Sequence, residues 1–123
     1  MDRGSASLAQ TIDRVAAMPN GRPLAEMLKI VQKDTDSASV SVSKDLHRAT
    51  LETSDGGLVF VGATAARQSR LNGPWNFRFK SPRETRQFRA LYFGGLNRQG
   101  IAIVHKLTAV EIGPKKTITL SAS

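Results

Sequence analysis

The sequence has no cysteine, only 6% aromatic residues and no long apolar segment. Without cysteine the chain has neither a disulfide framework nor a thiolate metal site. No apolar run approaches the ~20 residues of a transmembrane helix. Residues 1–5 lack the basic and then apolar layout of a signal peptide. We therefore expect a cytoplasmic protein with no transmembrane segment, and its 123 residues predict one domain.

Several motifs of catalysis and cofactor binding are also missing. The sequence has no Gly-x-Ser-x-Gly elbow, no Gly-x-x-x-x-Gly-Lys phosphate loop and no dinucleotide-binding fingerprint. The carboxylates show no two-ligand spacing beside a histidine. We therefore expect neither a metal nor a cofactor. His47 and His105 form a pair of acid–base candidates, but no third catalytic partner is evident.

Acidic residues are scarce in the second half of the chain. Residues 1–55 carry seven basic and eight acidic side chains, a net charge of −1, whereas residues 56–123 carry eleven and two, a net charge of +9. Within residues 67–98 Glu84 is the only acid. The basic residues of this segment are Arg67, Arg70, Arg78, Lys80, Arg83, Arg86, Arg89 and Arg98. This asymmetry predicts a polyanionic partner, and arginine matches phosphate geometry better than lysine.

The first third of the chain has helical periodicity. Apolar residues recur at helical spacing from Leu8 to Ala16 and again over residues 23–33, with Pro19-Asn20-Gly21 between them. The pattern predicts a helical hairpin within residues 1–36. A helix-turn-helix DNA reader has a similar layout, but both helices are nearly neutral, which does not favour that function.

From residue 37 the period changes to two. Residues 38–62 predict a three-stranded antiparallel meander, with a hairpin signal at Asp55-Gly56-Gly57. Residues 75–80 predict a strand, and Ser81-Pro82-Arg83-Glu84 is a capping box that predicts a helix over 82–93. A final pair of strands follows at 101–112 and 117–120. The expected fold is α+β: the helical hairpin of residues 1–36 and a third helix pack on an antiparallel sheet of five or six strands within residues 37–123.

The clustered arginines predict a protein that binds RNA or single-stranded DNA. A helix over 82–93 would align Arg83, Arg86 and Arg89 along one side. Trp75 and Tyr92 are candidates for stacking on bases, whereas aromatic residues on a strand face, such as Phe77 and Phe79, more often belong to a core. An alternative is a non-catalytic accessory module, of phage or plasmid type, that binds an acidic protein or an anionic surface. An exposed edge strand near the C-terminus also allows a dimer.

Residues 71–106 resemble toxins of the RelE/HigB type, which are small ribosome-dependent mRNA endonucleases. The similarity lies in Leu71-Asn72-Gly73-Pro74-Trp75-Asn76-Phe77-Arg78-Phe79, in Phe88-Arg89-Ala90-Leu91-Tyr92-Phe93 and in Ile101-Ala102-Ile103-Val104-His105-Lys106. The resemblance implies a metal-independent ribonuclease and a strand, not a helix, at 88–93. The catalytic and RNA-contacting residues that it implies are Arg78, Arg89, Tyr92, His105 and Lys106.

Overall fold

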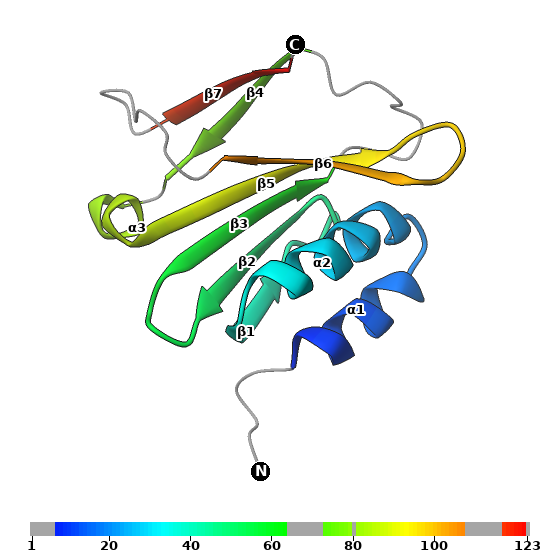
Figure 1. The fold of residues 1–123 in the computed structure, drawn as a ribbon, viewed down its shortest axis with the longest axis horizontal. Helices are drawn as coiled ribbons and strands as arrows, with labels where there is room; N and C mark the ends of the chain where they lie inside the picture. Colours follow the sequence, from blue (N-terminus) through cyan, green and yellow to red (C-terminus); the bar gives the residue numbers. More distant parts are fainter. Residues whose placement is uncertain (1–6, 64–72, 80, 108–116, 123) are drawn as a thin grey trace.

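The computed structural model describes residues 7–63, 73–79, 81–107 and 117–122. Within them the chain forms three helices and seven strands (Figure 1). The helices are α1 (Leu8–Ala16), α2 (Arg22–Asp34) and α3 (Pro82–Gln87). The strands are β1 (Ser37–Val42), β2 (Arg48–Thr53), β3 (Leu58–Ala63), β4 (Gly73–Arg78), β5 (Phe88–Leu96), β6 (Ala102–Leu107) and β7 (Thr117–Ala122).

The N-terminal helical hairpin is confirmed, and local signals explain its ends. The Ser7 hydroxyl accepts a hydrogen bond from the Gln10 amide at 3.1 Å, and the Gln10 side chain accepts one from the Ser7 amide at 3.3 Å. This capping box starts α1. The turn to α2 uses Asn20 at a φ of 65° and Gly21, where a Cβ would lie 2.0 Å from the Val15 carbonyl oxygen. Only glycine therefore fits at position 21.

Five strands form one sheet in the order β1-β2-β3-β5-β6, and β4 pairs with β7 in a separate two-stranded sheet. The meander β1-β2-β3 is antiparallel as predicted, and β5 and β6 are also antiparallel. The β3–β5 pair is parallel, because the chain returns through β4 and α3 before it re-enters the sheet. The predicted α+β class is confirmed, with a sheet that is antiparallel except at this one pair.

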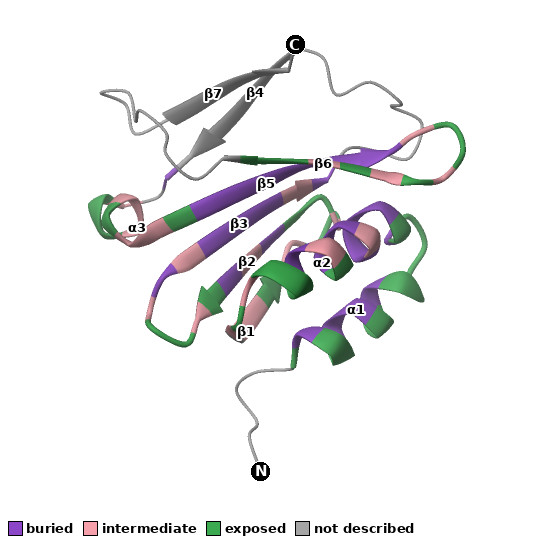
Figure 2. Ribbon diagram, in the orientation of Figure 1, coloured by how far each residue is buried: buried purple, intermediate pink, exposed green. Residues whose placement is uncertain are grey.

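The main core lies between the two N-terminal helices and one face of the large sheet (Figures 1 and 2). Val15, Leu24 and Leu28 are fully buried on the helices, and Leu51 and Val61 face them from the sheet. The opposite face of the sheet carries a second apolar group. There the ring of Phe60 lies 5.7 Å from Phe79 and 5.9 Å from Phe88, measured between ring centroids.

The predicted helix over 82–93 is wrong in its second half. Ser81 caps α3 as expected, accepting a hydrogen bond from the Glu84 amide at 3.3 Å, but the helix ends at Gln87 and β5 begins at Phe88. The apolar run after Gln87 pairs with both β3 and β6, and residues 90–96 are all buried. This tertiary pairing overrides the local helix signal, since a continuous apolar run suits a strand covered on both faces.

The remaining strands lie close to their predicted positions. β4 covers most of the strand expected at 75–80, and β6 and β7 are the final two strands. β7 pairs with β4, and β6 pairs with β5. Residues 108–116, which include the end of the strand expected at 101–112, lie outside the described residues.

Candidate nucleic-acid interface

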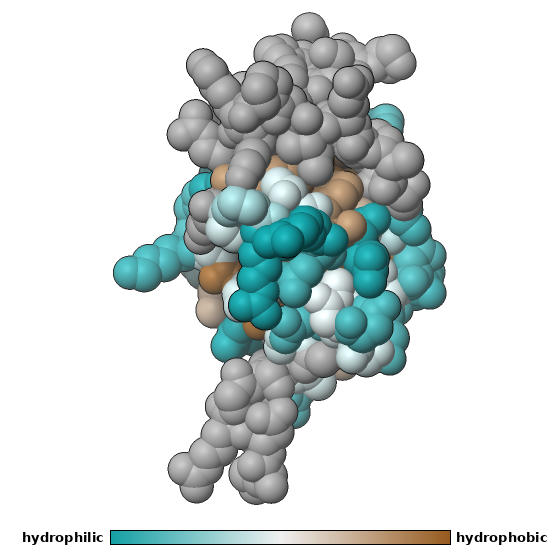
Figure 3. Space-filling view, turned by 90° about the vertical axis from the view of Figure 1, so that its left-hand side faces the viewer, coloured by the Kyte–Doolittle hydropathy of each residue, from teal (hydrophilic) through white to brown (hydrophobic). Residues whose placement is uncertain are grey.

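Arg83 and Arg86 are exposed on α3, a helix without a buried residue, at one end of the large sheet. Arg89 is also exposed but belongs to β5, so the predicted three-arginine stripe along one helix is wrong. Viewed from the side on which α3 lies, the described surface is mainly hydrophilic, with a smaller apolar area beside the atoms drawn in grey (Figure 3). This end of the sheet therefore presents three arginines that the sequence predicted, on two elements.

Arg98 is separated from these three residues. It lies in the turn between β5 and β6, at the opposite end of β5 from α3 (Figure 1). Nine strand residues lie between the two ends, a distance of about 30 Å at the usual rise per residue. Arg67, Arg70 and Lys80 lie outside the described residues, as do the side chains of Trp75 and Arg78.

Arg89 is positioned by the β2–β3 hairpin. Its Cγ occupies the space beside Gly57, where a Cβ would approach it to 2.5 Å, and its guanidinium lies 3.5 Å from the Asp55 carboxylate. Asp55 also accepts hydrogen bonds from the Thr53 hydroxyl and the Gly57 amide. The Thr53 hydrogen bond is the largest cause that lowers the pKa of Asp55, followed by the Gly57 amide, and Arg89 adds a smaller effect.

Tyr92, Asp34 and Lys106 form a second polar cluster beside Arg89. The Tyr92 hydroxyl donates to Asp34 at 3.3 Å, and the Lys106 Nζ atom lies 3.9 Å from the same carboxylate and 5.3 Å from the Tyr92 ring centroid. A hydrogen bond with Tyr92 raises the pKa of Lys106, and Asp34 adds a smaller effect. Tyr92 is only 1% exposed, so its ring is not accessible for stacking on a base, contrary to the prediction.

Both clusters line one groove of about 350 Å³. It is formed by the end of α2, the β2–β3 hairpin, β5 and β6, and it carries charges of both signs. The charged residues that line it are Asp34, Asp36, Asp55, Arg89 and Lys106. Three acids against two bases make the groove itself a poor phosphate site, so the exposed arginines of α3 are the better candidates for phosphate contacts.

The catalytic residues that the toxin resemblance implies do not all lie in one place. Arg89, Tyr92 and Lys106 share the groove, whereas His105 precedes Lys106 in β6 and points to the other face of the sheet. There the imidazole stacks on Phe93 at 5.1 Å between ring centroids. His105 is therefore not part of the groove.

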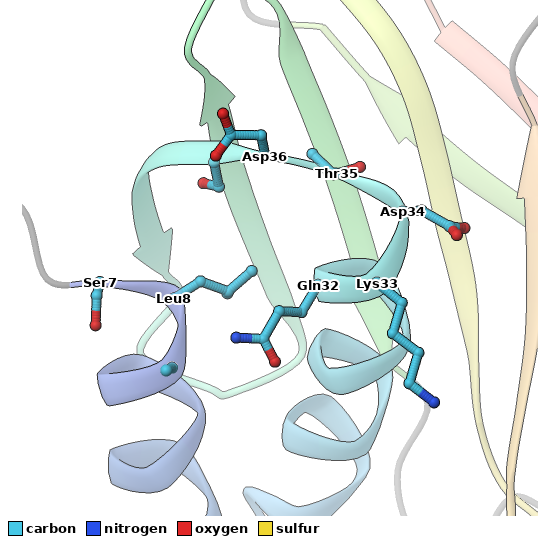
Figure 4. A pocket seen from close by; sticks show the side chains of 9 residues that line it. Ser7, Leu8, Gln32, Lys33, Asp34, Thr35 and Asp36 are labelled. Atoms are coloured by element: carbon cyan, nitrogen blue, oxygen red, sulfur yellow. The ribbon is translucent and has the colours of Figure 1, made fainter.

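A second groove, of about 510 Å³, lies between the start of α1 and the end of α2 (Figure 4). Its polar lining includes Ser7, Gln32 and Asp36. Asp34 contributes to both grooves, but its side chain points away from Ser7 and Leu8, which agrees with its hydrogen bond from Tyr92. The Asp34 carboxylate is therefore engaged with the Tyr92 cluster of the first groove.

Sequence reasoning missed the acids of the first groove. No sequence motif singles out Asp34, and Asp55 enters the sequence analysis only as part of the Asp55-Gly56-Gly57 hairpin signal. Asp34 lies 58 positions from Tyr92 in sequence, so no local pattern indicates their contact. Among the described residues, no group of three or more His, Asp or Glu side chains is arranged to hold a metal ion, and no described helix is long and apolar enough to span a membrane.

Comparisons with known proteins matched no family model, no curated protein and no solved structure.

Proposed function

We propose that this protein binds RNA or single-stranded DNA, with phosphates held by the exposed arginines at the α3 end of the sheet. One observation carries the proposal: Arg83 and Arg86 are exposed on a helix that contributes nothing to the core, within a half of the chain that has a net charge of +9. A helix with no buried side chain has little structural need for two arginines. Clustered exposed arginines are the usual electrostatic footprint of a phosphate backbone.

The neighbouring acids limit where the phosphate backbone of the nucleic acid can lie. Asp55 pairs with Arg89, and Asp34 lies beside Lys106, so both groove cations already have a negatively charged neighbour. Among the described residues, neither Arg83 nor Arg86 forms an ion pair with a carboxylate, in contrast to Arg89 and Lys106. We therefore propose that the nucleic-acid backbone contacts α3 and does not enter the groove.

Affinity for a fluorescent single-stranded oligonucleotide tests this function. We expect the affinity of the wild-type protein to fall steeply with salt, and the double variant Arg83→Ala/Arg86→Ala to bind more weakly. Loss of two phosphate contacts should also flatten the dependence of log K on log salt by about 1.4. Measurements with RNA and DNA of the same sequence show which nucleic acid is preferred.

The matched control is Arg14→Ala/Arg48→Ala, which removes the same charge from two exposed positions on α1 and β2. We expect a smaller loss of affinity, because these residues contribute only to the long-range field. Equal losses in the two double variants would show that net charge, and not α3, determines binding. If the wild-type protein binds neither RNA nor DNA at low salt, an acidic protein or an anionic surface becomes the better candidate for the partner.

Ribonuclease activity is the second candidate. The observation that favours it is the groove that holds Arg89, Tyr92 and Lys106, three of the residues implied by the resemblance to RelE/HigB-type toxins. In this arrangement Arg89 and Lys106 would have to exchange their contacts with Asp55 and Asp34 for a phosphate in order to stabilise its charge, while Tyr92, hydrogen-bonded to Asp34, would exchange a proton. His105 lies on the other face and has no role in this version.

Growth on expression and cleavage of RNA test the second candidate. A toxin should arrest growth, and Tyr92→Phe, which keeps the buried ring, should relieve the arrest, as should Arg89→Ala. His105→Ala is the discriminating variant, because the groove geometry predicts no effect while the resemblance predicts relief. Normal growth at high expression of the wild-type protein would exclude the toxin function.

A further inference from the structure

The outer edge of β6 has the features of a protein interface. In the two sheets that the structure describes, β6 has a strand neighbour on one side only. Ile101 and Ile103 are 62% and 39% exposed along it, and only Met18 joins them as a large exposed apolar side chain among the described residues. Edge strands normally avoid exposed apolar rows, because unpaired backbone groups recruit further strands.

We infer that β6 pairs antiparallel with β6 of a second copy of this chain, about a two-fold axis that passes beside Val104. The axis extends the five-stranded sheet to ten strands across the two copies. Because this two-fold axis is perpendicular to the sheet, the helices of both copies lie on the same face. Ile101 and Ile103 are already exposed in the single copy.

The charged side chains of β6 are compatible with this register. With Val104 at the axis, Ile103 lies opposite the partner's His105, and Lys106 lies opposite the partner's Ala102. Like charges directly opposite each other destabilise an antiparallel pair, and this register has none.

A second copy explains the separation of Arg98 from the other arginines. In an antiparallel pair the β5–β6 turn of one copy lies toward the α3 end of the other. The partner's Arg98 therefore approaches the surface formed by Arg83 and Arg86, and the interface completes a basic surface that one copy presents only in part. This consequence rests on the proposed nucleic-acid function, whereas the pairing of β6 does not.

Sedimentation velocity without nucleic acid, over a wide range of protein concentration, tests the pairing. We expect a concentration-dependent dimer in the wild-type protein and in Met18→Asp, and a monomer in Ile103→Asp. The two variants carry the same charge change at apolar side chains of nearly equal exposure, 38% and 39%. A monomeric wild-type protein at all concentrations, or a dimer that survives Ile103→Asp, would overturn the inference. Circular dichroism checks that both variants remain folded.

A cysteine scan tests the register, since the natural chain has no cysteine. Val104→Cys should form a covalent dimer under mild oxidation, because directly opposed residues on paired strands lie within disulfide distance. Met18→Cys should not cross-link under the same conditions. Absence of a Val104→Cys dimer in a protein that is dimeric by sedimentation would refute this register.

Nucleic-acid affinity separates this inference from the proposed function. If Ile103→Asp is monomeric and loses several-fold more affinity than Met18→Asp, the partner's Arg98 is part of the surface. If it is monomeric and binds as well as Met18→Asp, nucleic-acid binding stands and the shared surface is refuted. If the wild-type protein is dimeric but binds no nucleic acid, the interface stands and the proposed function fails.

Discussion

Replacing Thr11 by valine should stabilise the protein. Thr11 lies on the buried side of α1 with no exposed surface, and its hydroxyl has no hydrogen-bond partner within the described part of the chain. A buried hydroxyl without a partner costs about 1–3 kcal/mol, because it gives up its hydrogen bonds to water. Valine has almost the same shape and a similar helix propensity, so neither strain nor propensity offsets the gain.

We expect Thr11→Val to raise the free energy of unfolding by about 1–2 kcal/mol. For a chain of this length, each kcal/mol corresponds to an increase in Tm of about 3–6 °C. Thermal and denaturant unfolding followed by circular dichroism measure both quantities. The contrasting variant is Thr85→Val, since the Thr85 hydroxyl donates to the Pro82 carbonyl at 2.6 Å and its loss should destabilise by about 0.5–1.5 kcal/mol. A destabilised Thr11→Val protein would refute the reasoning and would indicate that the hydroxyl is hydrogen-bonded.

Two further predictions concern the sheet and its hairpins. Gly94→Ala should destabilise the fold by about 1–3 kcal/mol, because its Cβ would lie 2.0 Å from the Ile103 carbonyl oxygen in β6. Gly62→Ala is the control in β3, where no atom lies within 4 Å of the added Cβ, and urea unfolding of both variants should show the contrast. The lowered pKa of Asp55, whose usual value is 3.8, contributes stability that is complete above that value and is lost as the pH falls through the lower pKa of the folded state. At acid pH the free energy of unfolding should therefore change less with pH in Asp55→Asn than in the wild-type protein. The same pH dependence in both proteins would contradict the hydrogen bonds from Thr53 and Gly57.

Patterns confined to short segments predicted the N-terminal half well. The helical hairpin follows from apolar spacing and from the Pro19-Asn20-Gly21 break, and the meander follows from alternation and from the Asp55-Gly56-Gly57 turn. Each of these elements packs against its neighbour in sequence, so local signals and the final structure agree.

The region after Ser81 shows where local reasoning stops. Phe88, Leu91 and Tyr92 fit a helical stripe, yet they also belong to a run that is apolar at nearly every position. Pairing with β3, some 30 positions earlier, and with β6 selects the strand. The same limit applies to the candidate site, because Arg89 belongs to the basic second half of the sequence, whereas its ion-pair neighbour Asp55 comes from residues 1–55.

The parallel β3–β5 pair has a consequence for synthesis on the ribosome. The segment up to Ala63 contains both long helices and the whole meander, so it can begin to fold before the rest of the chain emerges. Until β5 follows, β3 is an edge strand, and its sequence Leu-Val-Phe-Val has neither charge nor proline to block pairing with another chain. At about 5–20 residues per second this exposure lasts a few seconds, and premature termination after residue 63 would leave β3 unpaired and prone to aggregation.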